Sequence, residues 1–245
     1  MRELCRLGLL AVVSLGAGLA CSSRELLWRV VRTYPGCVYF AEVRAPLVAL
    51  TIDDGPDSVT TPVLLDVLAA HAARATFFLI SSRVVGNEAV VARMVREGHE
   101  LGNHLTRDEP SIKLPPEAFA AALQEADSVL SWFAEVRWFR PGSGWYNASM
   151  LAAARKQGLR CALGSVYPLD AALPWTWLAT QYILANVKPG DIIILHDGNG
   201  RGHRTAQTLR RILPALRKRG FRVVTLSELL AAEERESGRD GNKTF

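Results

Sequence analysis

Side chains able to do acid–base and metal chemistry stand at several points of the chain, each directly after a short apolar run. The first are Asp53 and Asp54, which follow the run at residues 47–52. Neighbouring side chains on an extended backbone point in different directions, so one carboxylate can hold a cation while the other serves as general base. Asp-Gly-Pro is also a strong turn signal, and the pair alone more often marks an ordinary turn.

His104 and Asp108 are spaced i and i+4, which in a helical turn puts both side chains on one side. With Asp54 they would supply three ligands to a divalent cation and leave positions open for water and a substrate oxygen. Such mixed carboxylate and imidazole ligation suits zinc, cobalt, manganese or nickel. The competing interpretation is an ordinary solvated loop.

His196 follows the run at residues 191–195 and is predicted to emerge at the end of a strand. A histidine in that position is a good proton donor if a carboxylate raises its pKa, and Asp170 is the candidate partner. Asp170 suits a capping or turn role equally well, so both roles stay open.

Arg140 precedes Pro141-Gly142-Ser143-Gly144, a compact turn that can present backbone N–H groups to an oxyanion near Ser143. The Arg140 guanidinium can pair with a catalytic aspartate, orient it and keep it ionised. A salt bridge at the rim of the fold is the more common role for such an arginine.

The elements that must position these residues alternate between short apolar runs and helical patterns, which predicts an α/β fold built on parallel strands. Strands are predicted at residues 47–52, 75–80, 100–103, 138–140, 161–166, 191–195 and 221–225, with helices at 61–73, 88–97, 117–133, 147–158, 178–187 and 205–219. No repeat or long linker divides them, so we expect one distorted (β/α) barrel of about seven parallel strands. The candidate residues follow strand ends, and ligands bind at that edge of parallel β/α folds.

Together these segments resemble the polysaccharide deacetylase family, also called the NodB homology domain or carbohydrate esterase family 4. Thr51-Ile52-Asp53-Asp54-Gly55-Pro56 is close to the family's Thr-Phe-Asp-Asp-Gly-Pro, which implies Asp53 as general base and Asp54 as metal ligand. Residues 98–104 match the lead-in to the family's His-Ser/Thr-x-x-His, with His104 as the first ligand. His196 corresponds to the histidine of Leu-x-His.

Three positions depart from the family pattern. Asp108 stands where the second histidine ligand is usual, which adds negative charge and favours harder metal ions. Ser143 replaces the aromatic residue of Arg-Pro-Pro-Tyr-Gly, and Trp145 or Tyr146 is the candidate for the missing wall of the groove. Asp170 is the best match in a degenerate Asp-x-x-Asp-Trp and implies the carboxylate that tunes the catalytic histidine.

The resemblance implies a metal-dependent hydrolase that removes N-acetyl groups from an amino-sugar polymer or oligomer, of chitin-oligosaccharide or peptidoglycan type. Asp53 would deprotonate the attacking water, and His196 would protonate the leaving amine. Two alternatives stay open. One is a metal-free carbohydrate-binding relic of the same fold, and the other is a deacetylase acting on a different amide or ester, such as acetylated xylan.

The N-terminus predicts export. Arg2 and Arg6 precede an apolar run at residues 7–20, the layout of a signal peptide rather than a full membrane span. Cleavage after Ala20, lipoprotein processing at Cys21 and an uncleaved membrane anchor all remain open, so we expect a secreted or envelope-anchored protein. Its four cysteines have no metal-knuckle or redox spacing, and a Cys37–Cys161 bridge stays untested by the sequence.

We therefore divide the chain into a signal peptide or anchor at 1–20, an extension at 21–46, a catalytic domain at 47–230 and a polar tail at 231–245. The net charge of +5 comes with no nucleic-acid motif, so we expect a solvated basic surface. The expected partner is an N-acetylated carbohydrate. We expect no nucleic acid, membrane contact only through the N-terminal segment, and a monomer.

Overall fold

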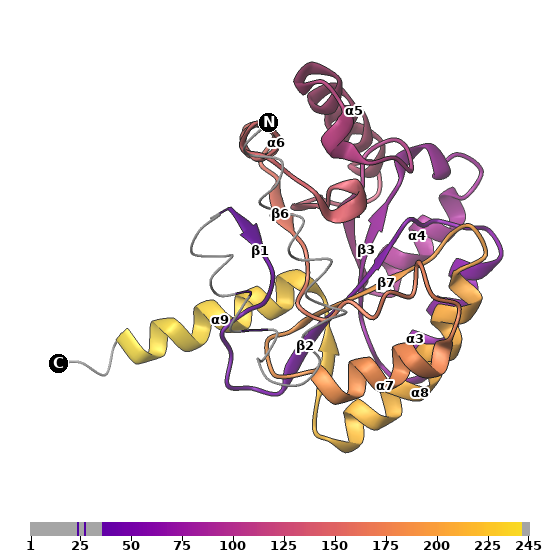
Figure 1. The fold of residues 1–245 in the computed structure, drawn as a ribbon, viewed down its shortest axis with the longest axis vertical. Coiled ribbons are helices and arrows are strands. Elements are labelled where there is room, and N and C mark those ends of the chain that lie inside the picture. The colour runs from indigo at the N-terminus through magenta and orange to yellow at the C-terminus, as the bar shows by residue number, and fades with distance from the viewer. Residues whose placement is uncertain (1–23, 25–26, 28–35, 242–245) are drawn as a thin grey trace.

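The computed structural model describes Arg24, Leu27 and residues 36–241 (Figure 1). The predicted signal peptide or anchor at 1–20 lies outside the described residues. Within those residues, no helix is both long and apolar enough to span a membrane.

Parallel strands form one curled sheet, in the order β1-β6-β5-β4-β3-β2-β7, with β8 also paired to β2. Their bounds are β1 Cys37–Val38, β2 Leu47–Asp53, β3 Thr76–Leu79, β4 Glu100–Asn103, β5 Trp138–Phe139, β6 Arg160–Ala162, β7 Ile192–His196 and β8 Arg222–Val224. A single parallel bridge between Val166 and Ile193 joins the two sides of the curl. The structure thus confirms the predicted single α/β domain, as a half-barrel rather than a closed one.

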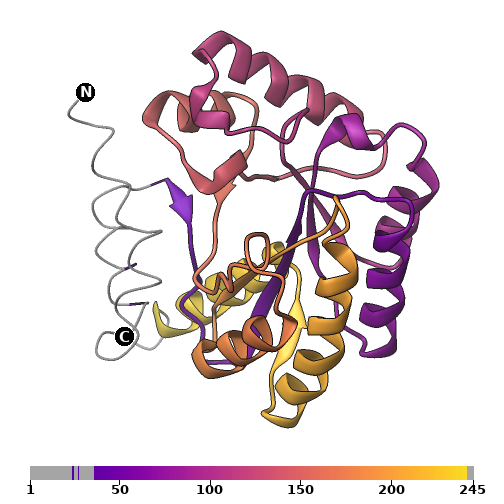
Figure 2. The same ribbon diagram turned by 45° about the vertical axis from the view of Figure 1, so that its right-hand side comes forward.

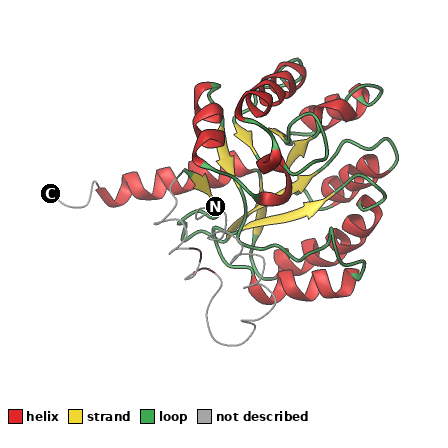
Figure 3. Cartoon of the chain, turned by 45° about the horizontal axis from the view of Figure 1, so that its top comes forward, coloured by secondary structure: helices red, strands yellow, loops and turns green. Residues whose placement is uncertain are grey.

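All of the described helices except the last cover the outside of the sheet, as Figures 2 and 3 show. Their bounds are α3 Thr60–Ala70, α4 Glu88–Arg96, α5 Pro116–Leu130, α6 Ala148–Lys156, α7 Thr176–Asn186, α8 Gly202–Lys218 and α9 Leu226–Gly241. Short 3-10 turns lie at η1 Ser81–Arg83, η2 Ser111–Lys113 and η3 Gly142–Gly144. The Asn147 side chain accepts a hydrogen bond from the Met150 N–H and so caps α6 where the sequence predicts it.

Strand β2 shows how the sheet separates its two faces. Successive side chains of a strand point to opposite faces. Val48, Leu50 and Ile52 pack among the residues of the helical layer, whereas Leu47 and Ala49 belong to a separate cluster on the concave face. All seven residues of β2 are buried, as expected for a parallel strand covered on both sides.

The concave face carries both apolar and polar side chains. Its apolar cluster includes Ala49, Phe78 and Trp138, and Phe78 is the register partner of Asp53. The same period places Thr51 and Asp53 further along that face, so polar groups collect at the carboxyl end. The fold therefore presents a charged edge on an apolar floor.

Helix α9 replaces much of the predicted polar tail. Leu226, Leu229 and Leu230 are buried in the concave cluster, and the helix then extends away from the other elements (Figure 1). Glu233 and Glu236 accept hydrogen bonds from backbone N–H groups of the segment before β2 and so tie this part of the helix to that segment. The segment predicted as a polar tail is therefore helical as far as Gly241.

Candidate active site

Asp53 is the last residue of β2 and is held by an arginine from a neighbouring strand end. Arg140 Nη1 donates to Asp53 Oδ1 at 2.6 Å and to Thr51 Oγ1 at 2.7 Å. Both members of the ion pair are almost fully buried, with side chains 2% and 5% exposed. The short, buried contact fixes which way the Asp53 carboxylate faces.

Arg140 is itself held on every side. Its Nε and Nη2 donate to the carbonyls of Ala162 and Leu163 at 2.9 and 3.0 Å. Its guanidinium also lies over the Phe78 ring, 4.1 Å from the centroid. A planar fork of five donors can make this set of bonds, and a lysine ammonium cannot.

Asp54 faces away from Asp53 and towards His104. It has a φ of 72°, a left-handed conformation that aspartate tolerates better than most residues. Asp54 Oδ1 lies 3.3 Å from His104 Nε2, and the Arg140 carbonyl is 2.7 Å from His104 Nδ1. The two adjacent carboxylates therefore serve different neighbours, as the sequence suggests.

Charge and burial compete at this pair. Burial alone would raise the pKa of Asp54, but the His104 hydrogen bond and the charges of His104, His196 and Arg201 outweigh it and lower that pKa to about 2. Burial would lower the pKa of His104, but the same hydrogen bond and the two carboxylates raise it. Asp54 is therefore ionised at neutral pH.

Asp108 does not lie in a helical turn with His104. Residues 104–110 form an irregular loop in which Leu105 has a φ of 64°, a left-handed value that ends any helical path. The i and i+4 argument for a shared side is therefore wrong. The Asp108 side chain is 45% exposed and accepts hydrogen bonds from Arg83 Nη2 at 3.1 Å and Asn199 Nδ2 at 3.0 Å.

Two arginines missed by the sequence reasoning lie beside these carboxylates. Arg201 Nη2 is 2.9 Å from Asp54 Oδ2 and 3.7 Å from Asp108 Oδ2. Arg83, at the end of η1, donates through Nη1 to the Asp54 carbonyl and through Nη2 to Asp108. Neither arginine belongs to a recognised motif, so only their positions in the fold reveal them.

His196 and Asp170 form the second pair of the site. His196 Nδ1 lies 2.9 Å from Asp170 Oδ1, and the His196 N–H donates to Asp170 Oδ2, also at 2.9 Å. Burial would lower the pKa of His196, but this hydrogen bond and the charges of Asp170, Asp53 and Asp54 raise it. One carboxylate thus holds His196 through both Nδ1 and its backbone N–H.

Asp197 is a further residue that the sequence reasoning missed, although it follows His196 directly. Its side chain is fully buried and accepts hydrogen bonds from the hydroxyls of Thr60 and Thr61. Its N–H donates to the Asp53 carbonyl at 2.8 Å. Asp197 therefore ties the start of α3 to the ends of β2 and β7.

Ser143 and Trp145 lie on the loop that follows Arg140. Ser143 is exposed with a φ of 65°, and Trp145 is half-buried. Within the described part of the chain, neither residue hydrogen-bonds to the paired carboxylates and histidines. Their predicted roles with an oxyanion or a sugar stay predictions.

Two side chains, those of Asp54 and His104, are suited to bind one divalent cation. The Asp54 Oδ1 and His104 Nε2 donor atoms lie within one coordination sphere of each other. Among the described residues, no group of three or more histidine, cysteine, aspartate or glutamate side chains is arranged to hold a metal ion. Asp108, the predicted third ligand, is instead engaged by arginine and asparagine.

The sequence is similar to those of known deacetylases. The polysaccharide deacetylase family matches residues 41–162. A peptidoglycan-N-acetylglucosamine deacetylase of Bacillus cereus is 37% identical over 75% of this chain and 88% of its own. A chitooligosaccharide deacetylase of Bradyrhizobium is 35% identical over 74% and 90% of the two chains.

Solved structures extend the likeness to three dimensions. A family 4 acetyl xylan esterase from Clostridium thermocellum, in complex with a cobalt ion, superimposes with a TM-score of 0.71 at 31% identity, over 76% of this chain and 90% of that one. A mutant of a CE4 family pseudoenzyme, with restored enzymatic activity, gives a TM-score of 0.74 at 26% identity, over 81% and 72%. From its matched sequence and its shared fold, the chain belongs to the polysaccharide deacetylase family, the hydrolases of carbohydrate esterase family 4.

Proposed function

We propose that this chain removes N-acetyl groups from an amino-sugar polymer or oligomer of the chitin-oligosaccharide or peptidoglycan type. The observation that carries the proposal is that a carboxylate and an imidazole lie side by side at one edge of the sheet. Asp53 and His196 are register partners in β2 and β7, so both side chains belong to the concave face. The names of the two curated relatives support this substrate class.

In this reaction Asp53 takes a proton from water, and the water oxygen attacks the carbonyl carbon of the acetamide. Arg140 holds the Asp53 carboxylate in place during that step. His196, protonated and held through Nδ1 by Asp170, donates its Nε2 proton to the departing sugar nitrogen as the C–N bond breaks. The products are acetate and a free amino sugar.

Asp54 and His104 would hold the divalent cation. When bound, such a cation polarises the acetyl carbonyl and lowers the pKa of water. A cobalt-bound relative supports metal dependence, while the choice among zinc, cobalt, manganese and nickel is left to measurement. Asp54 and His104 contribute two buried donors, one anionic and one neutral when deprotonated.

The test is acetate release from a panel of chitin oligomers, peptidoglycan fragments and acetylated xylan, with each of the four metals. Asp53→Asn should lower turnover by about 10²- to 10⁴-fold, because the general base is lost while its shape is kept. Asp66→Asn, at a side chain 69% exposed, is the matched control and should keep full activity. Undiminished acetate release by Asp53→Asn would rule out the base assignment.

A second candidate, a carbohydrate-binding relic, is favoured by one specific observation, the engagement of Asp108 by Arg83 and Asn199. A relic would bind N-acetylated oligosaccharides and release no acetate from any substrate with any metal. Acetate release from acetylated xylan alone would instead favour an esterase.

We also propose that the chain acts outside the cytoplasm, in the secreted or envelope-anchored state predicted from residues 1–20. The apolar run behind two arginines supports export. Cell fractionation with an antibody to the catalytic domain tests it, and a signal confined to the cytoplasm would exclude it.

A further inference from the structure

Asp54 already faces positive charge in the structure. The carboxylates of Asp53, Asp54 and Asp108 are contacted by three guanidinium groups, those of Arg140, Arg201 and Arg83. A divalent cation bound at Asp54 would lie close to these positive charges and would be repelled by them. One of the three arginines would have to give way.

Arg201 is the arginine placed to do so. Its Nη2 approaches the same Asp54 carboxylate that faces His104, at 2.9 Å from Oδ2, and it also lies towards Asp108. The contact is an ion pair without good hydrogen-bond alignment, because among the described residues this buried nitrogen has no hydrogen-bond partner. Arg201 Nε donates one hydrogen bond of 3.3 Å to the Gly198 carbonyl in the same loop. Arg140 is held more firmly, by the carbonyls of Ala162 and Leu163, and Arg83 donates to the Asp54 carbonyl.

The loop before α8 explains how Arg201 reaches the site. Gly198, Asn199 and Gly200 all have positive φ, with values of 62°, 48° and 74°. A Cβ on Gly198 would lie 2.5 Å from Arg83 Nη1 and 2.9 Å from the Asp54 carbonyl oxygen, so only glycine lets this loop pass so close. The tight loop therefore places Arg201, the residue before α8, close to the carboxylates.

We infer that Arg201 is a built-in cation that competes with the divalent metal for Asp54 and thereby weakens metal binding by this chain. The inference rests on the proposed metal site at Asp54 and His104. Metal binding would require the Arg201 guanidinium to swing away from Asp54 Oδ2. Asp108 would receive it, since Arg201 already lies 3.7 Å from that carboxylate.

The experiment is calorimetric titration of cobalt(II) chloride into the full-length chain and four variants, each checked for its fold by circular dichroism. Arg201→Gln removes the charge and should tighten cobalt binding by about tenfold or more. Arg201→Lys keeps the charge and should bind as the native chain does. Arg210→Gln, at an exposed position of α8, the helix that follows Arg201, should stay within about twofold of native and so reports any effect of net charge alone. Asp54→Asn should abolish binding.

Equal affinity of the native chain and Arg201→Gln overturns the inference, as does an absence of cobalt binding by both. Tightening by Arg201→Lys to the same degree would show that shape, not charge, is responsible, and overturns it too. Acetate release is measured separately. A gain in cobalt affinity in a chain that releases no acetate would contradict the proposed function while leaving this inference in place.

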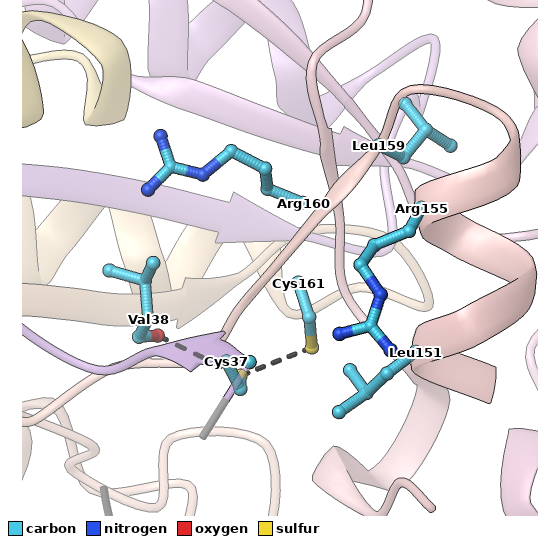
Figure 4. A pocket seen from close by; sticks show the side chains of 8 residues that line it. Cys37, Val38, Leu151, Arg155, Leu159, Arg160 and Cys161 are labelled. Carbon is cyan, nitrogen blue, oxygen red and sulfur yellow. Dashed lines mark hydrogen bonds between the residues drawn. The ribbon is translucent and has the colours of Figure 1, made fainter. Parts of the chain in front are cut away.

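A second and independent observation concerns Cys37 and Cys161, which are register partners in the parallel strands β1 and β6. Their sulfurs point towards each other and lie 3.1 Å apart (Figure 4). Both side chains are buried, and both line one pocket together with Leu151 and Arg155. In the structure both are free thiols.

We propose that these two thiols form an intrachain disulfide under oxidising conditions. One thiolate attacks a low-molecular-weight disulfide, forms a mixed disulfide and releases one small thiolate. The second cysteine sulfur then attacks the mixed disulfide, which forms the Cys37–Cys161 bond and releases the second small thiolate. The small disulfide is reduced as the two cysteines are oxidised. The bond would tie the first described strand to β6, next to the Ala162 carbonyl that holds Arg140.

Incubation of the full chain with oxidised glutathione, followed by digestion with trypsin and mass spectrometry, tests this. A linked pair of peptides containing Cys37 and Cys161 should appear and should vanish with dithiothreitol. The oxidised chain should melt roughly 5 to 15 °C above the reduced chain, and Cys37→Ser should lose this difference. Separate alkylation of both cysteines after treatment with the oxidant overturns the proposal, whatever the melting temperatures.

Discussion

At the scale of single residues, side chains of the same type in the site have different neighbours. Asp53 has a buried guanidinium, while Asp54 has an imidazole and a less well aligned arginine. His196 is paired with Asp170 through Nδ1, which leaves Nε2 for a proton. Different surroundings allow two neighbouring side chains of the same type to have different chemical roles.

Asp170→Asn tests the tuning of His196. The substitution removes the charge and the acceptor that raise the pKa of His196, so that pKa should fall. A protonated acid is present below its pKa and is lost as the pH rises through it. The alkaline limb of the kcat/KM profile should therefore move to lower pH, by about one unit or more. A profile that keeps its alkaline limb would remove Asp170 from this role.

At the scale of elements, the parallel strands β2 and β7 and the first turns of α3 and α8 bring the residues of the site together. Asp197 links the start of α3 to the ends of β2 and β7 through its own side chain and backbone N–H. Gly202 begins α8 against this junction. A Cβ on Gly202 would lie 2.2 Å from Asp197 Oδ1 and 2.5 Å from Thr60 Cβ.

Gly202→Ala should therefore destabilise the chain by about 1–3 kcal/mol, since the junction has no space for a methyl group. Gly238→Ala is the matched control, because its added methyl would meet nothing within 4 Å and lies in a helix. It should be neutral or should stabilise by up to about 1 kcal/mol. Urea unfolding of both variants measures the difference, and equal midpoints would contradict the crowding argument.

The sequence predicts those parts of the fold and site that depend on local pattern. Apolar runs ending in Asp53 and His196 identify both strands and their functional edge. Arg83 and Arg201 were missed because arginines are common on surfaces, and no local pattern marks one that folds back onto a carboxylate. Asp108 was assigned from a helical spacing that the left-handed Leu105 interrupts.

At the scale of the whole molecule, α9 closes the amino end of the curl. It was missed because its exposed turns are rich in charge, and its docking depends on contacts more than 100 residues apart, such as Leu226 N–H to Thr76 Oγ1. The Ser227 hydroxyl and the Trp138 indole both contact Glu100 in the same region. The helix thereby supports the apolar floor beneath Arg140, in which Phe78 lies.

Leu229→Ala should cost about 2–5 kcal/mol of unfolding free energy, because Leu229 is fully buried in that floor. Trp132→Ala removes a larger side chain that is 88% exposed and should change stability by less than about 0.5 kcal/mol. Thermal and urea unfolding provide the comparison. A smaller effect at Leu229 than at Trp132 would mean that α9 does not close the fold.

The register that pairs Asp53 with His196 has a consequence for how this scaffold can change. The gap between the acid and the base is fixed by the spacing of hydrogen-bonded strands, about 4.8 Å between neighbouring backbones, and not by any loop. The loops after the strands can therefore lengthen, shorten or be exchanged without moving His196 relative to Asp53. If these two residues act as proposed, one pair of strands keeps the same proton transfers while the surrounding loops change.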